Sequence, residues 1–108
     1  MSQSHVRGYH CSSAISVGEC VALDAVTSRT VIQTQTATLG SKPCIGLVAS
    51  KPSSTWCLVM WHGPLGGFVG LTTGQQYFAG DNGALATSGT QSVGVADSDT
   101  TLLVDVDK

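Results

Sequence analysis

Charged residues are scarce in this chain, at 11% of its 108 residues, whereas globular proteins average about 25%. The formal net charge is only −2, and the five Lys and Arg residues are scattered along the sequence. Binding to nucleic acid depends on clustered cations that displace counterions from phosphates. The sequence therefore predicts no direct contact with nucleic acid. It also predicts a surface made largely of Ser, Thr, Gln and Gly, or one covered by partner proteins.

The chain also lacks a long apolar segment. Its longest apolar run, residues 57–61, is far shorter than the ~20 residues that a membrane-spanning helix needs. Its first residues, MSQSHVRGYHCSS, contain no apolar core of a secretory signal. We therefore expect no membrane contact and synthesis in a cytosol, where cysteines stay reduced.

No spacing typical of a zinc site joins the four cysteines and three histidines. Three of the cysteines, Cys20, Cys44 and Cys57, lie within apolar, strand-like runs, where a thiol packs as a small hydrophobic side chain. We interpret the cysteines as buried free thiols, and disulfide bonds are the alternative. No metal and no other cofactor is expected.

Catalytic motifs are missing as well. The chain contains no G-x-S-x-G, and His62 stands alone at a strand end before a Gly-Pro turn. The pairs Asp97–Asp99 and Asp105–Asp107 lack the third ligand, the glycine and the distal glutamate of a calcium loop. The sequence predicts a protein that is not an enzyme. A small hydrolase-like enzyme is a remote alternative.

Most of the recognisable patterns in the sequence are typical of turns and β-strands. The 13 glycines and 42% apolar residues predict one all-β domain over residues 14–108, a small antiparallel β-barrel or β-sandwich. We expect strands within 19–24, 30–38, 44–49, 56–62, 93–96 and 100–106. We expect turns or loops at 50–54, 63–67, 81–83 and 97–99.

Two parts of the chain resemble each other. Residues 15–24 parallel 71–81 at an offset of 56, and residues 45–50 parallel 93–98 at an offset of 48. The match therefore requires a gap between the two pairs. Chance similarity among glycine-punctuated strands is the alternative explanation. A true repeat predicts two similar β-units packed together.

Residues 1–13 are polar and are interpreted as an extended N-terminal arm. Val6 and Tyr9 are its apolar anchors, and Arg7 lies between them. A frayed terminus is one interpretation. The other is an arm that becomes ordered by lying across a neighbouring protein, with Val6, Arg7 and Tyr9 as its contact residues.

The most apolar stretch, residues 56–62, is apolar on both faces. An antiparallel strand of this kind is either central in a sandwich or covered by another chain. Tryptophan is enriched in protein interfaces. The predicted oligomer interface is therefore formed by Trp56, Met60, Trp61 and the nearby Phe68, and a position in the core is the alternative.

The last third of the chain contains T-x-G-x-x-Y-F, a glycine turn, V-G-V-A and T-x-L-L-V-D. They lie within LTTGQQYFAGDNGALATSGTQSVGVADSDTTLLVD, and GECVALDA and CIGLVAS lie upstream. Together these motifs resemble the small capsid-decoration, or cement, proteins of tailed double-stranded DNA bacteriophages. The resemblance covers about residues 14–107 and rests on structural glycines and apolar strands.

The resemblance implies a β-barrel or β-sandwich knob on the outer surface of the virion capsid, synthesised in the cytoplasm of the bacterial host. It implies the major capsid protein as partner, a homo-oligomer that is usually a trimer, and no catalytic residues. Similar β-modules occur in phage tails and fibres, so a tail-fibre or receptor-binding module is the alternative function.

Overall fold

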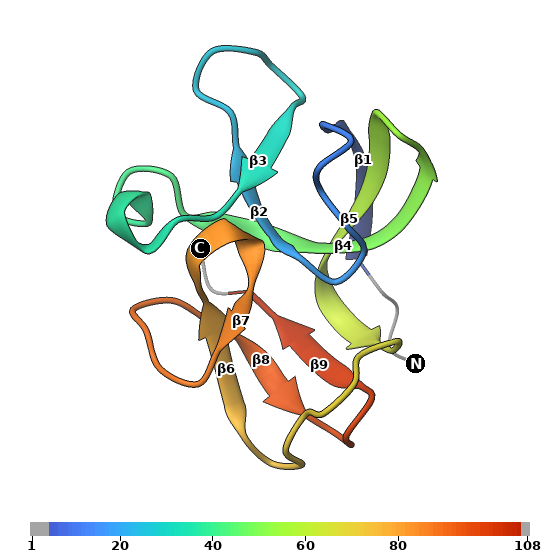
Figure 1. Ribbon diagram of the computed structural model, residues 1–108, viewed down its shortest axis with the longest axis vertical. Coiled ribbons are helices and arrows are strands. Elements are labelled where there is room, and N and C mark those ends of the chain that lie inside the picture. Colours follow the sequence, from blue (N-terminus) through green and yellow to red (C-terminus); the bar gives the residue numbers. More distant parts are fainter. Residues whose placement is uncertain (1–4, 107–108) are drawn as a thin grey trace.

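The computed structural model describes residues 5–106, which form one curled antiparallel sheet shaped as a half-barrel (Figure 1). This confirms the prediction of an all-β, barrel-like fold. Two short 3-10 turns, η1 (Thr36–Thr38) and η2 (Asp81–Gly83), interrupt the strands. The strands are β1 (His5–His10), β2 (Cys20–Leu23), β3 (Val31–Gln33), β4 (Cys44–Ser53), β5 (Trp56–Leu65), β6 (Gln76–Ala79), β7 (Leu85–Ala86), β8 (Ser92–Ala96) and β9 (Leu102–Asp105).

The strand order across the sheet is palindromic. It runs β3-β2-β4-β5-β9-β8-β6-β7, so that β2–β5 and β6–β9 form two four-stranded units in mirrored order. The first unit occupies the upper half of Figure 1 and the second the lower half. The units are joined by the pairing of β5 with β9, in which His62 lies opposite Asp105.

Strand register follows the offsets of the sequence repeat. Val21 lies opposite Gly46 in the first unit, and Tyr77 lies opposite Gly94 in the second. In both units the register shifts at the next residue of the first strand. The predicted repeat is therefore present in the pairing of the strands.

The turn that precedes the first strand of each unit is also repeated. The N–H of Gly18 donates to the carbonyl of Val48 at 2.8 Å, and the N–H of Gly74 donates to the carbonyl of Ala96 at 2.8 Å. Both glycines have a left-handed backbone, with φ of 91° and 84°. Glycine adopts this conformation without steric cost, which explains its recurrence at these two positions.

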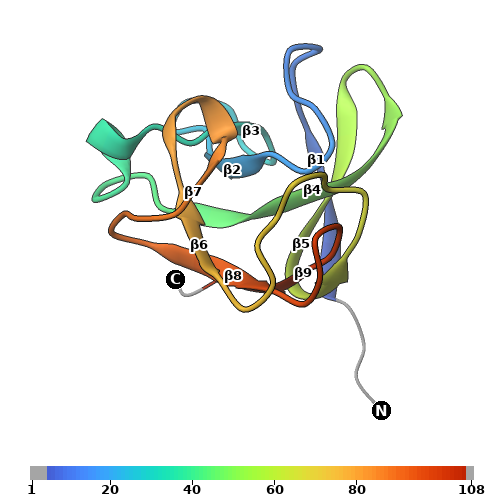
Figure 2. The same cartoon turned by 60° about the horizontal axis from the view of Figure 1, so that its bottom comes forward.

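Strands β4 and β5 lie between two apolar clusters. Leu47 and Met60 belong to the larger cluster, which includes most of the buried residues of the second unit, whereas Val48 and Val59 belong to the smaller one. Ile15, from the loop before β2, belongs to the smaller cluster. Figure 2 shows this loop beside β1, β4 and β2. The apolar character of both faces of β5 is therefore explained by burial within this chain. All four cysteines are buried and free, as predicted.

The described part of the expected N-terminal arm lies against its own domain as a strand. Residues 5–10 form β1, which pairs antiparallel with β5 from His5 opposite His62 to His10 opposite Trp56. Val6 and Arg7 are exposed, because an outer strand is held by backbone hydrogen bonds and leaves one face to water. The sequence of residues 5–10 did not predict a strand, because few of the side chains in this segment are apolar.

Several expected boundaries also differ. The predicted strand 30–38 divides into β3 and η1, and the predicted hairpin turn at 81–83 is the 3-10 turn η2. The expected loop 50–54 is largely part of β4, and β5 continues through the expected glycine-rich turn to Leu65. The turn at 97–99 lies where it was predicted, between β8 and β9.

Candidate functional site

The predicted interface residues are largely used by the chain itself. Met60 is 6% exposed and lies in the larger core, so its side chain presents little surface to a second subunit. Trp56 is half-buried, and its indole lies so close to Gly8 that no β-carbon would fit there. The His10 ring meets the Trp56 indole edge-on at 4.9 Å. Trp56 therefore contributes to holding β1 on β5.

Trp61 and Phe68 are also half-buried. The His5 ring stacks on Trp61 at 5.7 Å with an interplanar angle of 12°, while Trp61 packs against the larger core. Phe68 packs against the same core and beside Gly18. Their exposed parts stay available for contact with a partner, which keeps the interface prediction open for Trp56, Trp61 and Phe68.

The predicted contact residues Arg7 and Tyr9 belong to a cation–aromatic cluster. The guanidinium carbons of Arg7 and Arg29 each lie 5.8 Å from the centre of the Tyr9 ring. Arg29 also donates from Nη2 to the carbonyl of Gly8 at 2.9 Å. Arg29 could not be recognised from the sequence, because it reaches β1 from the loop between β2 and β3.

A shallow cleft opens between the loop before β2 and the loop after β5. Its volume is about 390 Å³, and Val17, Phe68 and Leu85 are among the residues that line it. Val17 is 52% exposed and Val69, on its rim, is 93% exposed. The cleft thus presents apolar side chains that the fold leaves in water, a feature typical of interaction sites.

His62 lies beside a smaller hollow of about 290 Å³. Asp105, its cross-strand neighbour, also lines the hollow, together with Pro64 and Leu103. A His–Asp pair alone performs no acyl transfer, because a nucleophile must lie within reach of the histidine. No Ser, Thr or Cys is among the lining residues of this hollow.

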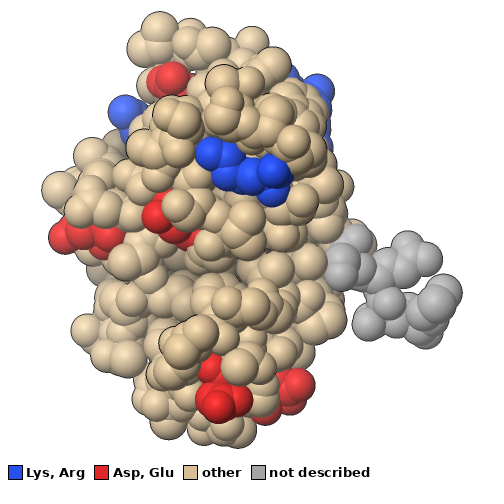
Figure 3. All heavy atoms as spheres, turned by 45° about the vertical axis from the view of Figure 1, so that its right-hand side comes forward, with Lys and Arg blue, Asp and Glu red and all other residues tan. Residues whose placement is uncertain are grey.

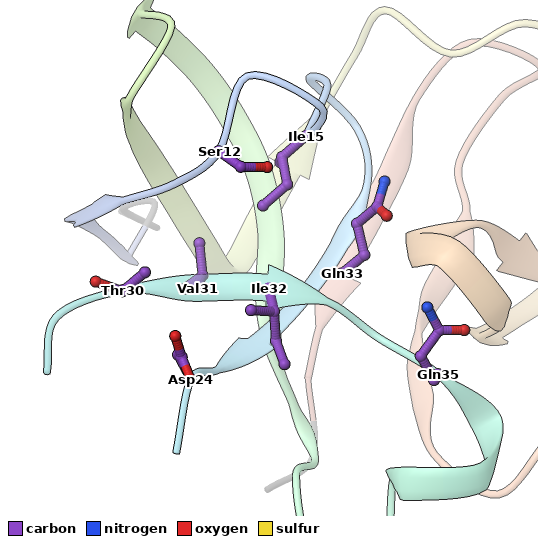
Figure 4. A pocket seen from close by; sticks show the side chains of 8 residues that line it. All are labelled: Ser12, Ile15, Asp24, Thr30, Val31, Ile32, Gln33 and Gln35. Atoms are coloured by element: carbon purple, nitrogen blue, oxygen red, sulfur yellow. The ribbon is translucent and has the colours of Figure 1, made fainter. Parts of the chain in front are cut away.

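A third hollow of about 440 Å³ lies beside β3. Figure 4 shows Ser12 and Ile15 on one side of it and the side chains of β3 on the other. Asp24 is its one acidic or basic lining residue, and Asp24 Oδ1 already accepts the N–H of Val26 at 3.0 Å. The hollow therefore offers hydrogen-bonding groups but no paired acid and base.

Two of the buried thiols, Cys20 and Cys57, are poor nucleophiles. A hydrogen bond with Cys44 together with burial raises the pKa of Cys20, and burial raises the pKa of Cys57 to about 12. Both thiols therefore stay protonated at neutral pH, and the thiolate is the reactive form. Within residues 5–106, no three His, Cys, Asp or Glu side chains gather as a metal site would require.

Hydrogen bonding holds the two units together at η2. Asp81 Oδ1 accepts the backbone N–H of Thr36 at 2.8 Å and its hydroxyl at 2.9 Å, and these bonds lower the pKa of Asp81. The buried Thr34 hydroxyl donates to the carbonyl of Gly80 at 2.9 Å. These polar groups have structural partners, which leaves the exposed cleft and the Tyr9 cluster as the candidate contact surfaces.

None of the helical segments in the described part of the chain has the length and apolar character needed to span a membrane. A comparison with known proteins found no matching family model, no matching curated protein and no matching solved structure.

Proposed function

We propose that the protein is a non-enzymatic structural protein of a bacteriophage virion. In this proposal it is a decoration, or cement, protein that binds the outer face of the capsid and stabilises the lattice of the major capsid protein. The observation that carries the proposal is the apolar cleft rim, where the side chains of Val17 and Val69 are exposed to solvent although both are apolar. The sequence resemblance supplies the capsid as partner.

The rest of the molecule is consistent with a rigid binding knob. The motif glycines Gly74 and Gly94 fix a turn and a close strand contact, so the residues that carry the resemblance build the scaffold. Burying one valine side chain contributes about 1.5–3 kcal/mol. Small contacts of this size add up when a protein engages several capsid subunits at once, and binding to the assembled lattice alone stabilises it by mass action.

Binding to isolated phage heads that lack the decoration protein tests the proposal. We expect the wild-type protein to cosediment with heads and to raise the temperature at which they release DNA. Val69→Asp should reduce occupancy about tenfold or more, because it places a charge in the apolar contact. Val26→Asp is the matched control, since Val26 is 91% exposed on a different loop.

Three results would contradict the proposal. They are absence of binding to heads, equal occupancy of the Val69 and Val26 variants, and binding to a host-cell surface glycan in place of heads. The last result would favour the tail-fibre or receptor-binding module. A folded state that matches the wild type by circular dichroism makes each variant interpretable.

A further inference from the structure

Charge is divided between the two halves of the molecule. Among the described residues, the half up to β5 contains four basic and two acidic residues, and the half from residue 66 contains four acidic and no basic residues. Figure 3 shows basic side chains only in the upper half of this face, where acidic side chains also lie, and acidic side chains alone at its lower end. The molecule therefore has a basic end and an acidic end. The basic residues are Arg7, Arg29, Lys42 and Lys51, and the acidic ones of the second half are Asp81, Asp97, Asp99 and Asp105.

At the basic end, two guanidinium groups are held next to the Tyr9 ring. Arg29 has a left-handed backbone with φ of 57°, a conformation that costs a non-glycine residue energy. Its carbonyl accepts the N–H of His10 at 2.7 Å, and its Nη2 donates to the carbonyl of Gly8. The position of Arg29 at the Tyr9 ring, which Arg7 also contacts, is thus fixed by its hydrogen bonds to β1.

Neither guanidinium forms an ion pair within the part of the chain that the structure describes. Arg7 and Arg29 are both exposed. Two arginines beside an aromatic ring form a receptor for carboxylates, because guanidinium binds carboxylate oxygens through paired hydrogen bonds. Four described cations are too few for the many phosphate contacts of a nucleic-acid surface.

At the acidic end, the turn between β8 and β9 presents two carboxylates. Asp97 and Asp99 are exposed, and neither has an ionic partner within residues 5–106. The turn backbone is fixed, because the N–H groups of Asp97 and Ser98 both donate to the carbonyl of Thr101, at 2.8 and 3.3 Å. The Cα atoms of Asp97 and Asp99 lie at most about 7 Å apart, so one turn presents two carboxylates to the two guanidiniums that flank the Tyr9 ring.

We propose that the Arg7–Tyr9–Arg29 cluster of one copy binds the Asp97–Asp99 turn of a second copy. The cluster and the turn are different surfaces, so the contact is head-to-tail, and repeating it closes a ring or extends a filament. A closed ring gives the homo-oligomer that the proposed function expects. The inference rests on that function only for its biological purpose, because self-association is measured without capsids.

Sedimentation velocity over a range of protein concentrations tests the contact. We expect the wild-type protein to associate at about 50 mM salt and to dissociate at about 500 mM, because salt screens exposed charges. Arg7→Glu should weaken association about tenfold or more. The double variant Asp97→Lys/Asp99→Lys should have the same effect from the other surface. Lys42→Glu, which makes the same charge change outside the cluster, should associate as the wild type does.

Mixing the two reversed variants gives the decisive measurement. Arg7→Glu protein and Asp97→Lys/Asp99→Lys protein should form heterodimers, because the intact Asp97–Asp99 turn of the first variant can bind the intact Arg7–Tyr9–Arg29 cluster of the second. A monomeric wild type, equal weakening by Lys42→Glu, or absence of association in the mixture would overturn the inference. So would association with a short DNA duplex in place of self-association. A capsid-binding monomer would refute this contact while leaving the proposed function intact.

Discussion

Replacement of Gly46 or Gly94 by alanine tests whether the two units share one construction. A β-carbon at Gly46 would lie 2.5 Å from the carbonyl oxygen of Met60, and one at Gly94 would overlap the carbonyl oxygen of Leu103. Gly46 and Gly94 hold the same place in their units, opposite Val21 and Tyr77. Each glycine allows its strand to approach the next strand closely.

The expected loss follows from these contacts. A carbon atom and a carbonyl oxygen are in van der Waals contact at about 3.3 Å or more. Each alanine must therefore push the two strands apart by roughly 1 Å. Overpacking of this kind costs about 1–3 kcal/mol, and we expect about 2–3 kcal/mol because the obstacle is backbone. For a domain of this size the melting temperature should fall by about 8–15 °C. The double variant should lose nearly the sum of both effects, since the sites lie in different units.

Urea denaturation followed by circular dichroism, with calorimetry alongside, measures these losses. Gly40→Ala is the control, because a β-carbon at Gly40 meets no atom within 4 Å. It should leave the free energy of unfolding unchanged or raise it by about 0.4–1 kcal/mol. The reasoning is refuted if either Gly46→Ala or Gly94→Ala is as stable as Gly40→Ala. A large loss at one position only would show that the units share strand order but not packing.

Two further predictions concern buried polar groups. Burial raises the pKa of Cys57 to about 12 in the fold, so the unfolded chain releases this proton first, and the free energy of unfolding should fall as the pH rises above about 8.5. The fall from this thiol is about 1.4 kcal/mol per pH unit. Urea titrations at pH 9 and 10 should show that the free energy of unfolding of Cys57→Ala falls less with pH than that of the wild type. Thr34→Val should cost about 1–3 kcal/mol, because the buried carbonyl of Gly80 loses its donor. Thr34→Ser should retain most of the stability in the same denaturation assay, and equal loss in both variants would show that the hydroxyl is unimportant.

Elements with a local pattern could be predicted from the sequence. The expected strand 93–96 corresponds to β8, and the alternation of Leu102 and Val104 with Leu103 and Asp105 correctly placed β9. The repeat was visible because its turns need glycine at Gly18 and Gly74, a requirement that leaves a direct trace in the residue type.

Features that depend on distant partners could not be predicted in this way. β1 is a strand because its backbone pairs with that of β5. The sequence of β1 is mostly polar and contains few residues typical of strands. Trp56, Met60 and Trp61 suggested an interface because both faces of their segment are apolar. Burial of Met60 by the second unit and packing of Trp56 on Gly8 arise from the topology, which hydrophobic pattern alone does not reveal.

The pairing of β1 with β5 also bears on the order in which the protein is built. β1 is made before β2, β3 and β4, and its partner strand β5 is made only after them. The β4–β5 hairpin closes through the two residues between Ser53 and Trp56, and such hairpins form within about 1–10 μs. The nascent chain therefore carries β1 without its partner until the hairpin appears, and unpaired strand edges of this kind are prone to aggregate.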